Sequence, residues 1–215
     1  MYKKKPFFIV FEGVEGCGKS YQSKKLFNKL TKKKVDTILT REPGGTKSSE
    51  LIRNLILKDY FVKDSKEKFD KYTDTLLYLA ARNEHIKNKI KPALLKKKVV
   101  ICDRFIDSTI AYQVYGKKVN LNFINNIHKQ ILNNIKPNIV FVLKVSKKTS
   151  KNRLRKRRTN NRYDNFAQSF YTKAQKSFIK IAKNKKNYYI LDSSNNDTTL
   201  ELKIFDIIKK NLNIK

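Results

Sequence analysis

The stretch FFIVFEGVEGCGKS, residues 7–20, decides the fold of this chain. Its first part is a short run of aromatic and β-branched residues, which is typical of a buried strand. Its second part matches the complete GxxxxGK[ST] pattern with Gly13, Val14, Glu15, Gly16, Cys17, Gly18, Lys19 and Ser20. This pattern is informative when it follows a strand and opens a helix, as it does here. The stretch therefore predicts a phosphate-binding loop (P-loop) that binds ATP.

The residue types in this loop explain why it binds a nucleotide. Glycines let backbone N–H groups turn inward around phosphate oxygens, and the helix that follows presents its positive N-terminal end. Lys19 is expected to reach the β- and γ-phosphates, and the Ser20 hydroxyl is expected to bind Mg²⁺. Asp103, which ends a later apolar run beside Arg104, is placed to approach the same metal.

The rest of the chain alternates between short apolar runs and segments with helical spacing. Strands are predicted at 7–11, 35–39, 99–102, 139–145 and 188–191. Helices are predicted at 18–32, 48–58, 71–95, 107–115, 122–135, 149–156, 165–183 and 198–212. This alternation favours an α/β fold with a five-stranded parallel sheet and helices on both faces. The length predicts a single domain, 1–215, and the basic tract at about 147–165 is a candidate lid.

The charge of the chain is unusual, because 50 Lys and Arg residues against 18 Asp and Glu residues give a net charge of +32. Three explanations remain open: compositional drift toward A/T-rich codons, attraction of anionic substrates, and a nucleic-acid role. The lysines are scattered, and no zinc finger or arginine-glycine repeat accompanies them. Drift is favoured, and no specific nucleic-acid partner is expected.

The compartment is predicted from apolar and cysteine content. No run approaches the about 18 apolar residues of a membrane span, and residues 1–13 lack the features of a cleaved leader. Cys17 and Cys102 are the only cysteines and form no CxxC pair, which indicates neither a disulfide framework nor a zinc site. We expect a cytoplasmic protein with no membrane partner.

Four separated segments together resemble the thymidylate kinase family, and they span much of the chain. They are FEGVEGCGKS (11–20), TREPGGT (40–46), LLYLAAR (76–82) and DRFIDSTIAYQ (103–113). The resemblance implies the nucleoside monophosphate kinase variant of the P-loop fold and transfer of the γ-phosphoryl group of Mg-ATP to dTMP in dTTP biosynthesis. It also implies a homodimer.

The resemblance assigns roles to residues of the acceptor pocket. Arginines that grip phosphate oxygens in bidentate fashion suit an acceptor with nearly two negative charges, and the matching positions are Arg41, Arg82 and Arg104. The remaining dTMP contacts implied are Tyr78 stacked on the base, Ser108 and Thr109 at the base edge, Tyr112 against the sugar, Tyr163, and Glu15 near the 3′-hydroxyl and the metal.

The resemblance also places the catalytic cations in the lid. One branch of the family carries a basic residue in the P-loop at the position of Gly16, whereas the other supplies it from the lid. The catalytic residues expected here are Lys19, Arg104, Arg153, Arg157 and Arg158. The chain departs from the family at Asn161-Arg162-Tyr163-Asp164, where Asp-Arg-aromatic-Glu is common.

Two other functions remain open at this point. A P-loop ATPase that binds nucleic acid would use the positive charge and would be stimulated by DNA or RNA. A kinase for another pyrimidine nucleotide, such as dUMP, would differ only in its preferred monophosphate.

Overall fold

The computed structural model describes residues 5–58, 67–156, 168–195 and 198–214. Its strands are β1 (Phe7–Glu12), β2 (Thr37–Arg41), β3 (Val99–Asp103), β4 (Ile139–Lys144) and β5 (Tyr188–Asp192). Its helices are α1 (Lys19–Lys32), α2 (Lys47–Leu57), α3 (Lys71–His85), the π-helix η1 (Ile86–Ile90), α4 (Lys91–Leu95), α5 (Ile106–Thr109), the π-helix η2 (Ile110–Gly116), α6 (Leu121–Ile131), α7 (Lys147–Arg155), α8 (Gln168–Ala182) and α9 (Thr199–Leu212).

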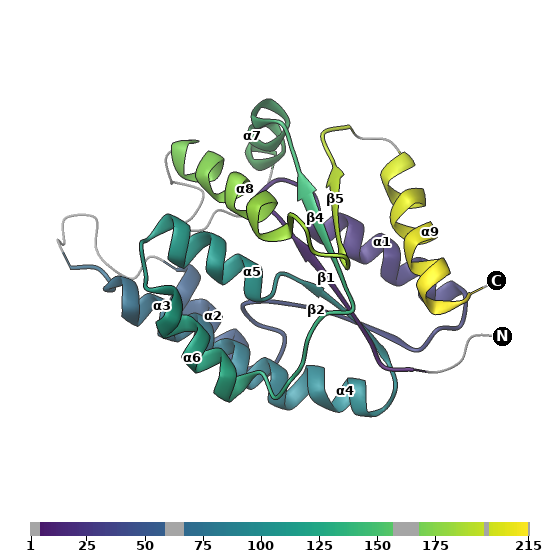
Figure 1. Cartoon of the computed structure of the whole chain (residues 1–215), viewed down its shortest axis with the longest axis horizontal. Helices are drawn as coiled ribbons and strands as arrows, with labels where there is room; N and C mark the ends of the chain where they lie inside the picture. Colours follow the sequence, from purple (N-terminus) through teal and green to yellow (C-terminus); the bar gives the residue numbers. More distant parts are fainter. Residues whose placement is uncertain (1–4, 59–66, 157–167, 196–197, 215) are drawn as a thin grey trace.

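The five strands form one parallel sheet in the order β2-β3-β1-β4-β5. Helices α1 and α9 lie on one side of it, and α3, α4, α5 and α8 lie on the other (Figure 1). All six residues of the central strand β1 are buried, since helices cover both faces of the sheet. This confirms the predicted α/β architecture and brings the carboxyl ends of β1, β2 and β3 together, where ligands of such sheets bind.

The predicted strand at 35–39 is displaced from β2, which spans Thr37–Arg41. Lys34 has a left-handed φ of 58°, and the Val35 N–H donates to Leu30 O at 3.0 Å. Val35 therefore belongs to the turn that ends α1, and apolar character alone did not separate it from the strand.

The helix predicted at 71–95 is one continuous helical path that changes geometry twice. The π-helix η1 separates α3 from α4, and Pro92 lies in the first turn of α4. A proline ring inside a helix clashes with the carbonyl four residues earlier, here that of Asn88 in η1. The wider π turn accommodates that clash.

The helix predicted at 122–135 ends four residues early, at Ile131. Asn133 and Asn134 adopt left-handed φ angles of 48° and 60°, which stop a right-handed helix.

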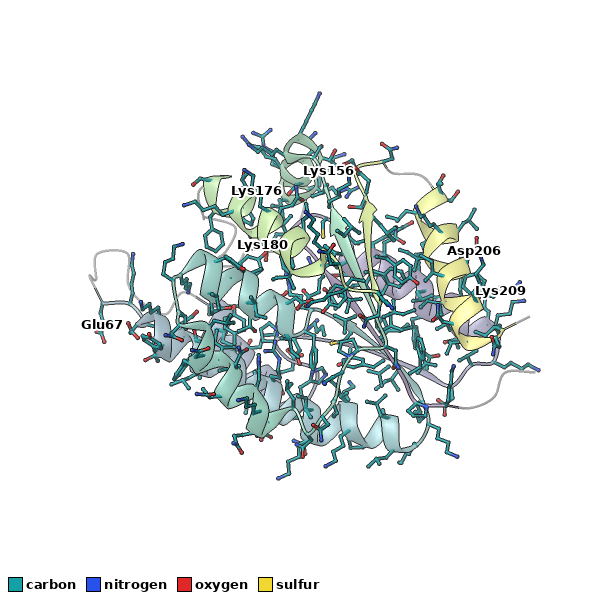
Figure 2. All side chains as sticks on the ribbon, in the orientation of Figure 1. Glu67, Lys156, Lys176, Lys180, Asp206 and Lys209 are labelled. Carbon is teal, nitrogen blue, oxygen red and sulfur yellow. The ribbon has the colours of Figure 1, made fainter. Side chains whose placement is uncertain are left out.

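The lysine excess covers the surface of several helices. Lys176 and Lys180 of α8, Lys209 of α9 and Lys156 beyond α7, all labelled in Figure 2, are exposed. Within the described part of the chain, no helix has the length and apolar content that a membrane crossing requires.

Candidate active site

The P-loop follows β1 and needs glycine at the positions where the sequence has it. Gly13 has a φ of 138°, and a Cβ there would lie 2.5 Å from Leu143 O of the neighbouring strand. Gly18 caps α1 with a left-handed φ of 89°. The Lys19 ammonium folds over this loop and donates to Gly13 O at 3.0 Å and Val14 O at 2.8 Å. A cation thus stands beside a ring of backbone groups at a helix N-terminus, which is a site for phosphate.

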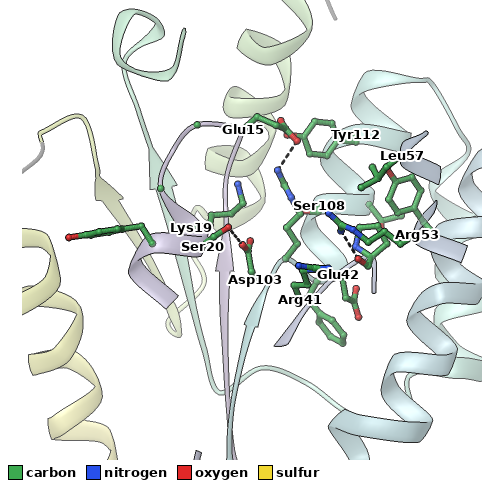
Figure 3. Close-up of a pocket in the computed structure, with 18 of the residues that line it drawn as sticks. Glu15, Lys19, Ser20, Arg41, Glu42, Arg53, Leu57, Asp103, Ser108 and Tyr112 are labelled. Carbon is green, nitrogen blue, oxygen red and sulfur yellow. Dashed lines mark hydrogen bonds and ion pairs between the residues drawn. The ribbon is translucent and has the colours of Figure 1, made fainter. Parts of the chain in front are cut away.

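Ser20 and Asp103 face one another across the strand ends (Figure 3). The Ser20 hydroxyl donates to Asp103 Oδ2, while Asp103 Oδ1 is buried and has no hydrogen-bond partner among the described residues. Mg²⁺ is usually held by one or two protein oxygens together with substrate phosphates and waters. The orphaned carboxylate oxygen beside a hydroxyl fits that requirement, and the described residues contain no cluster of three or more His, Cys, Asp or Glu that could hold a metal.

Glu15, also predicted to approach the metal, turns instead toward Arg104 and Tyr112. Arg104 Nη2 donates to its Oε1 at 2.8 Å, and the Tyr112 hydroxyl donates to its Oε2 at 2.5 Å. Burial would raise the pKa of Glu15, but Arg104, Lys19 and the Tyr112 hydrogen bond hold it below its usual value. Burial and this carboxylate both raise the pKa of Tyr112. Glu15 is therefore an ionised anchor for both side chains.

Arg41 lies at the end of β2 and lines a cavity that the P-loop also lines. It donates to both Glu50 oxygens at 3.1 Å and is 54% exposed, so it retains access to a ligand. Arg53, which we did not predict, lines the cavity beside it and donates to Pro43 O at 2.6 Å. In the sequence, only its spacing of three residues from Glu50 could have indicated this position, because residues so spaced lie on the same face of a helix.

Arg82 is placed quite differently from Arg41, because its side chain is only 3% exposed. Its Nε and Nη2 both meet Glu42 Oε2, at 2.8 and 2.7 Å. Nη2 also donates to Phe105 O, and Nη1 donates to Thr109 Oγ1 and His128 Nε2, all at 2.8–2.9 Å. Four hydrogen bonds and the close ion pair of Nη2 with Glu42 thus occupy the whole guanidinium. Arg82 borders the cavity as predicted, but it has no pair of free N–H groups with which to bind a phosphate.

Glu42 and its partners form the buried end of this network. Burial would raise the pKa of Glu42, yet Arg82 and His85 hold it below its usual value. His85 Nδ1 lies 3.1 Å from Glu42 Oε1, and its Nε2 lies 2.7 Å from Thr40 Oγ1. Burial, aided by Arg82, lowers the pKa of His128 to about 3. Glu42 and Arg82 thus line the cavity, and the two histidines lie behind them.

The residues predicted for the base edge are already hydrogen-bonded to the protein. The Ser108 hydroxyl donates to Glu12 Oε2 at 2.5 Å and accepts from Arg104 Nη1 at 3.0 Å. Thr109 accepts from Arg82, which leaves its own proton for the cavity. Gln113, which we did not predict, lines the cavity with a buried Nε2 that lacks a partner among the described residues.

The lid is described only over α7 and Lys156, so Arg157, Arg158 and Tyr163 lie outside the described residues. Arg153 donates to Gly16 O at 3.3 Å, Ser193 O at 2.8 Å and Asn195 O at 3.4 Å. Its guanidinium therefore joins the P-loop to the loop after β5.

Gly16 lies against the lid helix. A Cβ at this position would lie 2.8 Å from Ser150 O, and its φ is 71°. The close approach of α7 therefore leaves no room for a side chain at this position.

These groups share one cavity of about 520 Å³. In Figure 3, Lys19 and Ser20 lie toward one end of the cavity, and Arg53 and Leu57 lie toward the other. The predicted residues on its wall are Glu15, Gly16, Gly18, Lys19, Ser20, Arg41, Tyr78, Arg82, Asp103, Arg104, Ser108, Thr109, Tyr112 and Arg153. The structure thus brings two sets of cations, one on the P-loop side and one on the β2 side, to a single space.

Comparison with known proteins agrees with this geometry. The family described as thymidylate kinase matches residues 11–204. A thymidylate kinase from Aster yellows witches'-broom phytoplasma is 40% identical over 209 residues, which cover 95% of this chain and 96% of that protein. One from Wolbachia pipientis wMel is 43% identical over 178 residues, 81% of this chain and 84% of the relative. The crystal structure of thymidylate kinase from Ehrlichia chaffeensis has a TM-score of 0.74 and 31% identity, covering 95% of this chain and 99% of the other.

Proposed function

This chain belongs to the thymidylate kinase family, and from that premise we propose how its residues divide the transfer of a phosphoryl group from ATP to dTMP. The chain is a phosphotransferase that phosphorylates dTMP in dTTP synthesis. A dTMP phosphate oxygen forms a bond to the γ-phosphorus while the bond from that phosphorus to the β–γ bridging oxygen breaks, and ADP leaves. The attacking oxygen is already ionised, so no covalent intermediate or general base is required.

The P-loop side takes the donor. Lys19 exchanges its loop carbonyl partners for β- and γ-phosphate oxygens, and the glycine-rich backbone holds the remaining phosphates. Ser20 and Asp103 hold Mg²⁺, a proposal that the unpartnered Asp103 Oδ1 supports. When bound, the ion neutralises charge that develops on the phosphate oxygens.

The opposite wall takes the acceptor. Arg41, Arg53 and Arg104 bind its phosphate, because each lines the cavity and Arg41 is well exposed. Tyr78, a half-buried ring on α3, stacks on the base. The observation that most supports this assignment is that these side chains share one cavity with the P-loop.

The base edge is read by donors. Because Thr109 accepts from Arg82, its own hydroxyl proton is available to a carbonyl oxygen of the base. The unpartnered Nε2 of Gln113 offers a second donor. Two donors suit the oxygens of a pyrimidine dione such as thymine.

The sugar is sorted by the Glu15 and Tyr112 pair. Glu15 fixes the Tyr112 hydroxyl, and the Phe170 ring stacks on Tyr112 at a centroid distance of 5.7 Å. A ring held from two sides leaves little room for a 2′-hydroxyl, so a deoxyribose is preferred.

The lid supplies cations for the transferred group. Arg153 is bound to the P-loop and the loop after β5, so we assign it to the ATP side of the site. Arg157 and Arg158 are assigned to the transition state, and Tyr163 keeps its predicted place at the acceptor.

We also propose that the protein is a homodimer. Helix α2 carries Leu51 and Leu55 with exposed fractions of 70% and 43%, and its neighbour α3 carries Leu76 at 47%. Large exposed apolar side chains on two packed helices are typical of a protein interface. Light scattering at micromolar concentration tests this, and a monomeric mass would contradict it.

A cytoplasmic location is proposed as well. Cys17 and Cys102 are both free and buried, which suits a reducing compartment.

A coupled assay with ATP and each of dTMP, dUMP, dCMP and UMP tests the acceptor assignment. We expect the highest kcat/KM with dTMP. Highest activity with dUMP would favour the other pyrimidine kinase, and ATP hydrolysis that requires DNA or RNA would favour the nucleic-acid ATPase.

A further inference from the structure

The two histidines of this chain flank the same buried ion pair. His85 contacts Glu42, and His128 contacts Arg82, although the two histidines are far apart in the sequence. His85 belongs to α3, the helix that carries Arg82, whereas His128 reaches the pair from α6. The second contact therefore joins a separate surface helix to the wall of the acceptor pocket.

The position of His128 on α6 is one that an apolar residue would ordinarily occupy. Ile124, one turn earlier, is fully buried, and His128 is 5% exposed on the same face of the helix. A leucine there would satisfy packing alone. The imidazole instead places Nε2 at 2.9 Å from Arg82 Nη1.

The chemistry of the pair fixes the protonation of the ring. A guanidinium only donates, so His128 Nε2 must accept and carries no proton. The neutral ring then has its proton on Nδ1. His128 thus accepts from one N–H of Nη1, while the other hydrogen bonds of Arg82 go to Glu42, Phe105 O and Thr109.

We propose that His128 is a positioning residue for the acceptor pocket, which holds Arg82 so that Arg82 in turn orients the Thr109 hydroxyl. This rests on the proposed function, which assigns Thr109 to the base edge. Without an acceptor on α6, Arg82 Nη1 keeps one unpaired N–H at a buried position. The guanidinium then changes its orientation relative to Thr109 Oγ1 and Phe105 O. The Thr109 hydroxyl consequently loses its fixed direction in the pocket.

The test compares two variants with the same amide group but different reach. H128Q carries its amide oxygen far enough to replace Nε2, whereas H128N is one methylene shorter and leaves Nη1 unpaired. We expect H128N to raise KM for dTMP about tenfold, the effect of one unpaired buried donor, with kcat and KM for ATP changed less than about threefold. H128Q should return KM for dTMP to within about threefold of wild type. The exposed neighbour Lys129 provides the surface control, K129Q, which should change neither constant.

A third variant separates positioning from packing. H128L fills the apolar position without an acceptor, so a packing role predicts normal KM values and a positioning role predicts the same rise as H128N. If H128N does not fold, H128L against H128Q decides the matter. Equal KM for dTMP in H128L, H128Q and wild type overturns the proposal, as does a failure of both H128N and H128L to fold.

A substitution at Thr109 tests the His128 proposal separately from the assignment of Thr109 to the base edge. T109V removes the hydroxyl and should also raise KM for dTMP. If T109V has no effect, the base-edge assignment fails and the His128 proposal fails with it. If T109V raises KM and H128N does not, the assignment stands and only the His128 proposal is overturned.

Discussion

The donor side and the acceptor side of this cavity hold their cations by different means. Lys19 and Arg153 donate mainly to backbone carbonyls of the loops. Arg104 and Arg82 also donate to carbonyls, but each is in addition paired with a carboxylate: Arg104 with the largely buried Glu15, and Arg82 with the buried Glu42. Carbonyl contacts exchange readily for phosphate oxygens, whereas buried ion pairs fix a geometry before the ligand arrives. We therefore expect the proposed donor side to rearrange when ATP binds and the proposed acceptor side to keep its geometry.

The largest effect expected on the donor side is on kcat. Replacing both Arg157 and Arg158 by Ala should lower kcat at least about 10²-fold, since a cation aimed at the transferring phosphoryl group contributes about 10³–10⁵. Binding of ATP and dTMP should change less than about tenfold. Single-turnover kinetics measures the loss directly. Retention of wild-type kcat would make both side chains solvated surface charges.

A smaller effect is expected where the acceptor side sorts sugars. A 2′-hydroxyl against Tyr112 should lower kcat/KM by about 10- to 150-fold for the ribose counterpart of dTMP, equivalent to about 1–3 kcal/mol. F170A, which removes the ring stacked on Tyr112, should narrow that ratio. The measurement is a competition assay between the two nucleotides. Equal kcat/KM for the ribose and deoxyribose nucleotides in the wild type would show that the acceptor side does not select the sugar, and the contrast with the P-loop side would fail.

The smallest effect concerns stability of the acceptor network at acid pH. The pKa of His128 is lowered to about 3 from 6.5, so below pH 6.5 the unfolded chain binds a proton that the folded chain refuses. Stability from this group is present above pH 6.5 and falls as the pH drops, by up to about 1.4 kcal/mol per pH unit. Burial, with Asp107 nearby, raises the pKa of Glu12 to about 7, which acts in the opposite direction between pH 4.5 and 7.

Comparison with H128Q removes the contribution of Glu12. Urea unfolding of wild type and H128Q at pH 7, 6 and 5 should give free energies that diverge as the pH falls, with the wild type losing more. Parallel curves for the two proteins would show that His128 titrates normally in the folded state.

The donor side was largely predictable from sequence, and much of the acceptor side was not. The P-loop is a local motif, so Gly13, Lys19 and Ser20 could be assigned from consecutive residues. The five strands likewise followed from short apolar runs. The predicted ends of segments were wrong where a turn sets the boundary. At Val35, for example, the N–H donates back to Leu30 O of α1.

The acceptor side depends on partners that are distant in the chain. Arg82 meets Glu42 across 40 residues and His128 across 46, and no periodicity or spacing joins such positions. The sequence therefore indicated Arg82 as a pocket residue with N–H groups free to bind a phosphate. In the structure these groups are hydrogen-bonded to other residues of the protein. Arg53 and Gln113 were missed because an arginine or a glutamine on a helix is ordinarily a surface residue.

The central claim, that the two sides serve two substrates, is tested most directly by calorimetric titration of ATP and dTMP into K19A and R104A. The account predicts that R104A binds ATP with nearly the wild-type Kd and dTMP at least about tenfold more weakly, because a cation that lines the proposed acceptor side is lost. K19A should weaken ATP binding, leave the dTMP Kd nearly unchanged and abolish turnover. Weakening of ATP binding by R104A, with dTMP binding intact, would contradict the account and place the acceptor on the wrong side of the cavity.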